Sequence, residues 1–114
     1  MERYQKQAAI FKALMHPVRL AILEILGRGE ACVCHIEMQL GYRQAYISQH
    51  LAVLREAGLV QDRRDGWNVF YQVASAEIFD LLEISTAMAG ESLPALQASP
   101  NLENCPCPRC NHAV

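Results

Sequence analysis

The sequence has no apolar run that approaches the roughly 20 residues of a membrane-spanning helix. Its first residues, MERYQKQAAIFKAL, also lack the charged, apolar and small-residue regions of a secretory signal peptide. We therefore expect a cytoplasmic protein with no membrane partner, in which cysteine thiols stay reduced. With 114 residues, 52% of them hydrophobic and 19% charged, the chain predicts one globular domain rather than a disordered segment.

An overall positive charge, the simplest sign of a nucleic-acid partner, is also missing, because the formal net charge is −2. The charge is unevenly distributed, however. Residues 1–74 carry nine Lys or Arg against seven Asp or Glu, whereas residues 75–114 carry one against five. The larger, N-terminal part is therefore net positive, as contact with phosphates requires, and is the candidate for binding nucleic acid.

Hydrophobic periodicity and turn residues predict a mainly α-helical chain with one small β-hairpin. Two strands are expected on either side of the Asp65-Gly66 turn, at residues 60–64 and 68–73. From Gly90 the composition changes to Ser, Pro, Asn and Cys, which is typical of a flexible tail. The expected organisation is a folded domain over residues 1–89 and a Cys-rich tail over 90–114. The expected helices cover residues 2–14, 18–27, 33–40, 44–57 and 75–89.

A helix–turn–helix followed at once by a hairpin is the layout of a winged-helix DNA-binding domain. Four separated motifs strengthen this interpretation: HPVRLAILEIL, a CxC, YISQHLAVLREAGLV and RRDGWNVFYQV. Together they resemble the ArsR/SmtB family of metal-responsive bacterial repressors, in the family's order and over residues 6–89. The resemblance implies a homodimeric winged helix that is not an enzyme and that releases operator DNA when a metal or metalloid binds.

The second helix of a helix–turn–helix presents its N-terminal side chains to base edges in the major groove. Ile47, Leu51 and Leu54 fall on the other face of this helix and are expected in the core. The alternative is an ordinary amphipathic helix whose polar residues are only solvated. The side chains expected to bind DNA are rich in donors and acceptors: Arg43, Gln44, Tyr46, Ser48, Gln49 and His50.

The hairpin carries two further candidates for DNA contact. Arg63 and Arg64 are basic residues beside a protruding turn, which suits phosphate or minor-groove contact. Trp67 is expected to pack against the base of the hairpin instead.

Five cysteines in a cytoplasmic chain indicate metal binding or redox chemistry before structural disulfides. Cys32 and Cys34 lie at the expected start of the third helix, where regular geometry directs residues i and i+2 about 200° apart. They can share an ion only if this turn is irregular, so ligation is expected to distort the helix and lower operator affinity. In the resembling family a CxC here is the core of an arsenic, cadmium or lead site. The arsenic version adds a third cysteine three residues later, where this sequence has Glu37.

Further ligands are expected from the tail cluster CPCPRC, whose thiols belong to Cys105, Cys107 and Cys110. The preceding tail can extend about 50 Å, far enough to reach the helix pair of either subunit. Trivalent arsenic or antimony prefers three thiolates, whereas cadmium, lead or zinc accepts up to four sulfur ligands. One shared site and two separate sites both remain open, as do an inert helix pair and a structural zinc knuckle in the tail. The family's other metal site uses histidines of the final helix, and this chain has none there.

These patterns predict a repressor that releases operator DNA when arsenite or antimonite binds the cysteines. A repressor responsive to cadmium, lead or zinc is one alternative, and a repressor that senses oxidation through a disulfide is another. A thiol oxidoreductase that uses Cys107-x-x-Cys110 is disfavoured, because the sequence lacks the βαβ pattern expected around such a motif. A winged helix that binds only proteins is disfavoured by the polar recognition helix and the basic hairpin.

Overall fold

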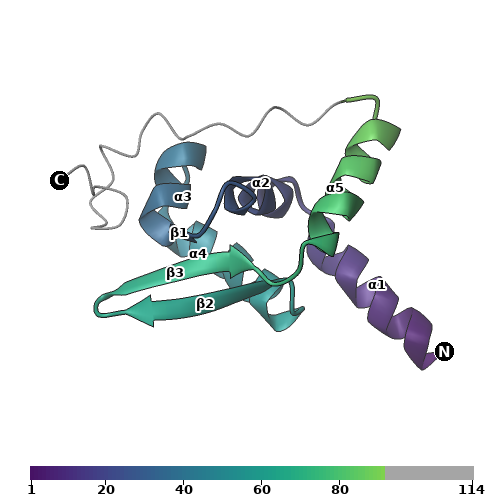
Figure 1. Ribbon diagram of the computed structural model, residues 1–114, viewed down its shortest axis with the longest axis horizontal. Coiled ribbons are helices and arrows are strands. Elements are labelled where there is room, and N and C mark those ends of the chain that lie inside the picture. Colours follow the sequence, from purple (N-terminus) through teal and green to yellow (C-terminus); the bar gives the residue numbers. More distant parts are fainter. Residues whose placement is uncertain (92–114) are drawn as a thin grey trace.

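The computed structural model describes residues 1–91 of the chain, and the tail cysteines lie outside these residues. The fold is mainly helical with a small antiparallel sheet, as the sequence predicts (Figure 1). In chain order the elements are α1 (Glu2–Leu14), α2 (Pro17–Leu26), β1 (Ala31–Cys32), α3 (Val33–Leu40), α4 (Gln44–Glu56), β2 (Val60–Asp65), β3 (Asn68–Val73) and α5 (Glu77–Met88).

Local sequence signals set the ends of the elements around the helix–turn–helix. His16 is extended, and its Nδ1 accepts a hydrogen bond from the backbone N–H of Val18. Pro17 is the first residue of α2, and because proline has no backbone N–H, no donor is left unpaired there. Gly41 ends α3 with a φ of 79°, a left-handed conformation that glycine adopts without a steric penalty. The turn between α3 and α4 is therefore fixed by the glycine that the sequence places there.

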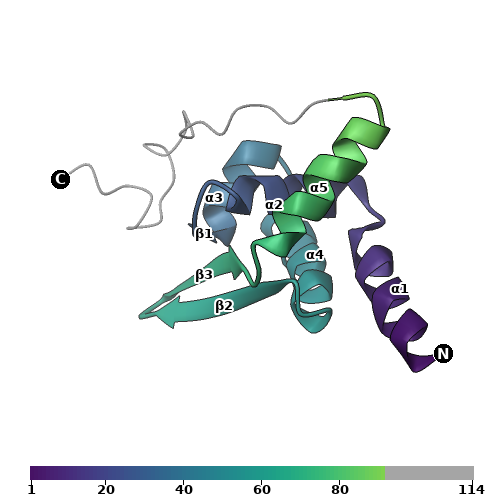
Figure 2. The same ribbon diagram turned by 45° about the vertical axis from the view of Figure 1, so that its right-hand side comes forward.

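The core joins α2, α3 and α4. Ile22, Ile36, Ile47, Leu51 and Leu54 are fully buried, and they come from all three helices. Figure 2 shows α2 between α5 and α3, with α4 beneath it and the sheet to one side. The expected buried face of the recognition helix α4 is confirmed, and it fixes which of its residues can face a partner.

The sheet has the strand order β1-β3-β2, and its first strand was not expected from the sequence. A two-residue strand has no periodicity to detect, so β1 is visible only through its pairing of Cys32 with Phe70. Strand alternation gives the sheet two different sides. Val60 and Tyr71 join the main core, whereas Phe70 packs with Cys32 in a small separate cluster.

The terminal helices α1 and α5 are less well covered than the centre. Helix α1 buries only Ala13 and Leu14, and it points away from the rest of the molecule in both views (Figures 1 and 2). Large apolar side chains on both helices are exposed, among them Phe11 and Ile84. Within residues 1–91, no helix combines the length and the apolar character needed to cross a membrane.

Candidate nucleic-acid interface and thiol site

The N-terminal part of α4 presents a polar face to solvent. Arg43 is the extended residue that precedes the helix, and the helix then turns Ile47 into the core. Ser48 is half-buried beside the exposed positions. The predicted DNA-contacting side chains that are exposed are Arg43, Gln44, Tyr46 and Gln49.

His50 is placed differently from the expectation, because its side chain is buried at 8% exposure. Its ring lies 4.3 Å from that of His16 and 4.6 Å from that of Tyr46, measured between centroids. Arg19 of α2 donates to His50 Nδ1 over 3.3 Å, with its own Nε donating to the carbonyl of Ala13. His50 therefore connects the recognition helix to α2, and its side chain is buried rather than exposed on the polar face of α4.

Burial lowers the pKa of His50, and the neighbouring His16 and Arg19 lower this pKa further. The neutral imidazole is thus the form that the fold favours. With Nδ1 accepting from Arg19, the remaining proton sits on Nε2, which has no hydrogen-bond partner among the described residues.

Tyr42 is a surface residue that the sequence interpretation missed. Its ring lies 5.1 Å from that of Tyr46, and both rings are substantially exposed. Tyr42 precedes the extended Arg43 and lies outside α4, so the helical spacing that identified the other candidates does not reach it. The two rings extend the polar face of α4 back over the turn.

In the hairpin, Arg63 is held by the fold. Its Nε and one terminal nitrogen donate to both carboxylate oxygens of Glu30 at 2.9 and 2.7 Å. Its guanidinium also lies 5.1 Å from the centre of the Phe70 ring and 3.9 Å from the carboxylate of Asp65. The hydrogen bonds that Arg63 donates to Glu30 raise the pKa of Arg63. Arg63 therefore braces the hairpin, with 42% of its side chain exposed.

Arg64 and Trp67 are the more accessible hairpin residues. Arg64 is exposed and lies opposite Val69 in the strand register. Trp67 is fully exposed at 101%, so the expectation that it packs against the hairpin base is wrong. The reason is the turn itself: Asp65 pairs with Asn68, so Gly66 and Trp67 form a two-residue loop beyond the last strand pair.

The two helix cysteines are brought together at the start of α3. Their Sγ atoms are in direct contact, and either thiol can donate to the other. Cys32 is buried and extended, with φ −87° and ψ 167°, and the helix begins only after it. The irregular helix start that a shared ion requires is therefore present, because only Cys34 has helical geometry. The two sulfurs can face one ion without unwinding the helix.

The thiol pair is joined to the hairpin as well as to α3. Cys32 pairs with Phe70 of β3, and Cys34 and Met38 pack against the same small cluster. Glu30, which clamps Arg63, lies two residues before Cys32 in the chain. A displacement at the sulfurs can therefore reach the hairpin through β1 and through this ion pair.

The described residues do not complete a metal site by themselves. No group of three or more His, Cys, Asp or Glu among residues 1–91 is arranged to hold a metal ion. His35 is half-buried, and desolvation together with the charge of Arg28 lowers its pKa. The pair Cys32 and Cys34 thus offers two sulfur ligands, and an ion that needs three or four must find the others elsewhere.

Comparisons with known proteins agree with this architecture. The family described as "Bacterial regulatory protein, arsR family" matches residues 16–62. An uncharacterised helix–turn–helix transcriptional regulator of Methanocaldococcus jannaschii is 48% identical over 75 residues, covering 64% of this chain and 84% of that protein. The biofilm growth-associated repressor of Agrobacterium fabrum is 40% identical over 82 residues, which cover 72% of this chain and 70% of that protein.

A solved structure extends the likeness to three dimensions. The homodimeric winged helix–turn–helix DNA-binding domain of a possible ArsR-family transcriptional regulator from Mycobacterium bovis superposes with a TM-score of 0.72 at 30% identity. The superposition covers 78% of this chain and 82% of that one. The chain belongs to the ArsR/SmtB family of winged helix–turn–helix transcriptional regulators.

Proposed function

We propose that this chain represses transcription by holding operator DNA and releases it when a thiophilic metalloid, arsenite or antimonite, binds its thiolates. One observation carries the sensing part of the proposal. Cys32 and Cys34 place two sulfurs side by side in a segment that is joined to both the recognition helix–turn–helix and the hairpin. A protein that binds chromosomal DNA in this way acts in the cytoplasm.

The DNA-binding part rests on the exposed face of α4 and on the hairpin. Gln44 and Gln49 can pair with adenine edges in a major groove, while Arg43 and Arg64 can reach phosphates. Arg55 of α4 lies 3.6 Å from Asp62 of β2, so the hairpin is tied to the recognition helix. Both elements can therefore contact the same duplex.

The sensing part needs a third ligand. Trivalent arsenic takes three thiolates in a pyramid, and the described residues supply two. The third is assigned to Cys105, Cys107 or Cys110 of the tail, from the same subunit or from a partner. Cadmium, lead or zinc could use the same sulfurs with a fourth ligand, so the ion has to be identified by experiment.

Ion capture requires the thiol pair to move. Cys32 is buried and packs with Phe70, so an ion and its further ligands can reach this sulfur only if the packing around it opens. Cys32 must then shift relative to Phe70, and the start of α3 shifts with Cys34. Because Ile36 of α3 and Leu51 of α4 are both fully buried in the same core, the shift can be transmitted to the recognition helix.

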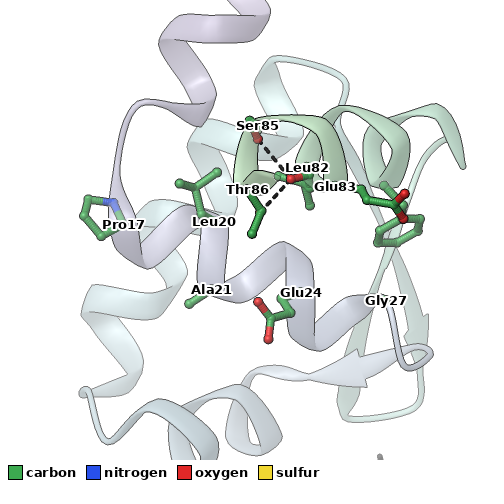
Figure 3. A pocket seen from close by; sticks show the side chains of 10 residues that line it. Pro17, Leu20, Ala21, Glu24, Gly27, Leu82, Glu83, Ser85 and Thr86 are labelled. Atoms are coloured by element: carbon green, nitrogen blue, oxygen red, sulfur yellow. Dashed lines mark hydrogen bonds between the residues drawn. The ribbon is translucent and has the colours of Figure 1, made fainter. Parts of the chain in front are cut away.

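The proposal includes a homodimer through α1 and α5. A groove of about 680 Å³ lies between α2 and α5 (Figure 3). Leu20 and Leu82 line this groove. The hydroxyls of Ser85 and Thr86 donate hydrogen bonds to the carbonyl of Leu82, so their polar groups are already paired within α5. A second groove of about 600 Å³ between α1 and α5 is also apolar. Such surfaces suit helices of a second copy, and sedimentation of a monomer at micromolar concentration would refute the dimer.

The decisive experiment is release of DNA by reduced protein in parallel titrations with arsenite, antimonite, cadmium, lead and zinc. The DNA is a duplex selected by the full-length chain from a random library. We expect release by the metalloids from the wild type and none from Cys32→Ser or Cys34→Ser, which should still bind the duplex. Serine is similar in size to cysteine but a much poorer ligand for a soft ion.

Two outcomes would change the proposal. If both serine variants release DNA normally, the helix pair is a packing feature and the tail cluster is the sensor. If peroxide releases the duplex and no ion does, the thiols sense oxidation instead. Single tail variants, such as Cys107→Ser, serve as matched controls, and we expect a weaker defect where the remaining tail thiols can substitute.

A further inference from the structure

Trp67 is the one tryptophan of the chain, and it lies at the outermost point of the hairpin. Its side chain is fully exposed, more so than any other large apolar residue described. In both views the hairpin turn projects beyond the helices (Figures 1 and 2). An indole in this position makes no packing contact with the core, because the loop lies beyond the last strand pair of the hairpin.

The position of Trp67 is also not demanded by the turn. A two-residue hairpin loop favours residues such as Gly and Asn that adopt positive φ, and here Gly66 has the positive φ of 64°. A small polar residue would serve at the second position. An indole left in water loses the favourable free energy of burying its apolar surface. A contact with a partner would restore this free energy.

The charges around the tip favour DNA as that partner. Asp65 lies 3.9 Å from Arg63, and Arg63 is also paired with Glu30, so these three residues carry a net charge of −1. Arg63 and Asp65 alternate with Arg64 along β2 and lie on the opposite strand face from it. Arg64 makes no ion pair within residues 1–91, and it lies on the strand face that carries Val60 and Tyr71. This is the side on which Asp62 meets α4. Because Asp62 is paired with Arg55, Arg64 is the positive charge that no ion pair among residues 1–91 offsets on the side of the recognition helix.

We propose that Trp67 is a DNA-contacting residue that packs its indole into the minor groove beside the site read by α4. The inference rests on the proposed function, since it needs an operator-bound winged helix. Apolar side chains inserted into a minor groove pack on sugars and can part a base step, and they add affinity without adding charge. Arg64 then fixes the hairpin on the backbone while Trp67 makes the apolar contact.

The experiment uses the full-length chain and the selected duplex, with Trp67 itself as the probe. Because the chain has no other tryptophan, its fluorescence reports on the hairpin tip alone. We expect the duplex to quench or shift the emission and to shield the indole from acrylamide. Trp67→Ala should weaken duplex binding by about ten-fold, as for loss of one aromatic–base contact, and Trp67→Phe by less.

Two comparisons separate this role from others. Trp67→Ala should leave the salt dependence of binding unchanged, whereas Arg64→Ala should reduce it, because only the arginine displaces counterions. Gln72→Ala, on the exposed side of the same hairpin near its base, is the matched control and should bind like the wild type.

The inference is overturned if the wild type binds the duplex while its emission and acrylamide access stay the same and Trp67→Ala binds equally well. It is also overturned if Trp67→Ala instead changes the sedimentation of the protein without DNA, since the tip would then contact a second copy. Failure of the wild type to bind any duplex would refute the proposed function itself, and the inference with it.

Discussion

The recognition helix and the hairpin both face the proposed DNA, but they are held in place in different ways. Helix α4 is fixed by fully buried side chains, including Ile47, Leu51 and Leu54. Strand β2 buries only Val60, and its outer half depends on the pairing with β3 and on the ion pair of Arg63 with Glu30. Helix α4 is therefore held rigidly by the core, whereas the hairpin can move more easily. The ion pair that supports the hairpin lies close in sequence to the thiol pair.

The largest expected effect comes from breaking the support of α4. Leu51→Ala removes a fully buried side chain and leaves a cavity, so the free energy of unfolding should fall by about 2–5 kcal/mol. Chemical denaturation followed by circular dichroism measures this. Val53→Ala on the exposed side of the same helix is the control and should change stability by less than about 1 kcal/mol. Equal losses for both variants would show that α4 is not the rigid element.

A second pair of variants separates base reading from phosphate contact. Gln49→Ala should weaken binding to the selected duplex by about 1–3 kcal/mol and leave binding to random DNA nearly unchanged. Arg64→Ala should weaken both and lower the salt slope by about one, because a phosphate contact carries no sequence information. Fluorescence anisotropy at several salt concentrations measures both effects. Equal losses of Gln49→Ala on the two duplexes would contradict its assignment to base edges.

A smaller effect is expected from loosening the brace of the hairpin. Glu30→Gln keeps the size of the side chain but removes its charge, and the ion pair with Arg63 is partly exposed, so stability should fall by less than about 1 kcal/mol. Hydrogen exchange should nevertheless become faster at the amides of β2 and β3 while those of α4 keep their protection. Faster exchange in α4 to the same extent would mean that the two elements are not held independently.

The smallest effect concerns pH and the contact between α4 and α2. Burial lowers the pKa of His50 below the ordinary histidine value of about 6.5, so the unfolded chain takes up a proton first as pH falls. The free energy of unfolding should therefore decrease as pH falls below about 6.5 and be unaffected by His50 above that value. Denaturation at a series of pH values measures the slope, and His50→Gln should make it shallower. A slope unchanged by His50→Gln would assign the effect to His35, whose pKa is lowered too.

Local patterns in the sequence predict the order and the type of most elements. Apolar residues at helical spacing, a glycine at the end of α3 and an Asp-Gly turn are local signals, so they predict α1 to α5 and the hairpin to within a residue or two of their ends. The same spacing identified the buried face of α4. The family could also be named, because four motifs in a fixed order need no knowledge of packing.

Only the tertiary structure decided how individual side chains are used. His50 and Arg63 look like DNA contacts in the sequence, but His16 and Glu30, which lie more than 30 residues away in the chain, engage them. The convergence of Cys32 and Cys34 required a short strand that exists only because β3 pairs with it. A side chain's neighbours across the fold, and not its own periodicity, set its exposure and its partners, and no spacing along the chain encodes them.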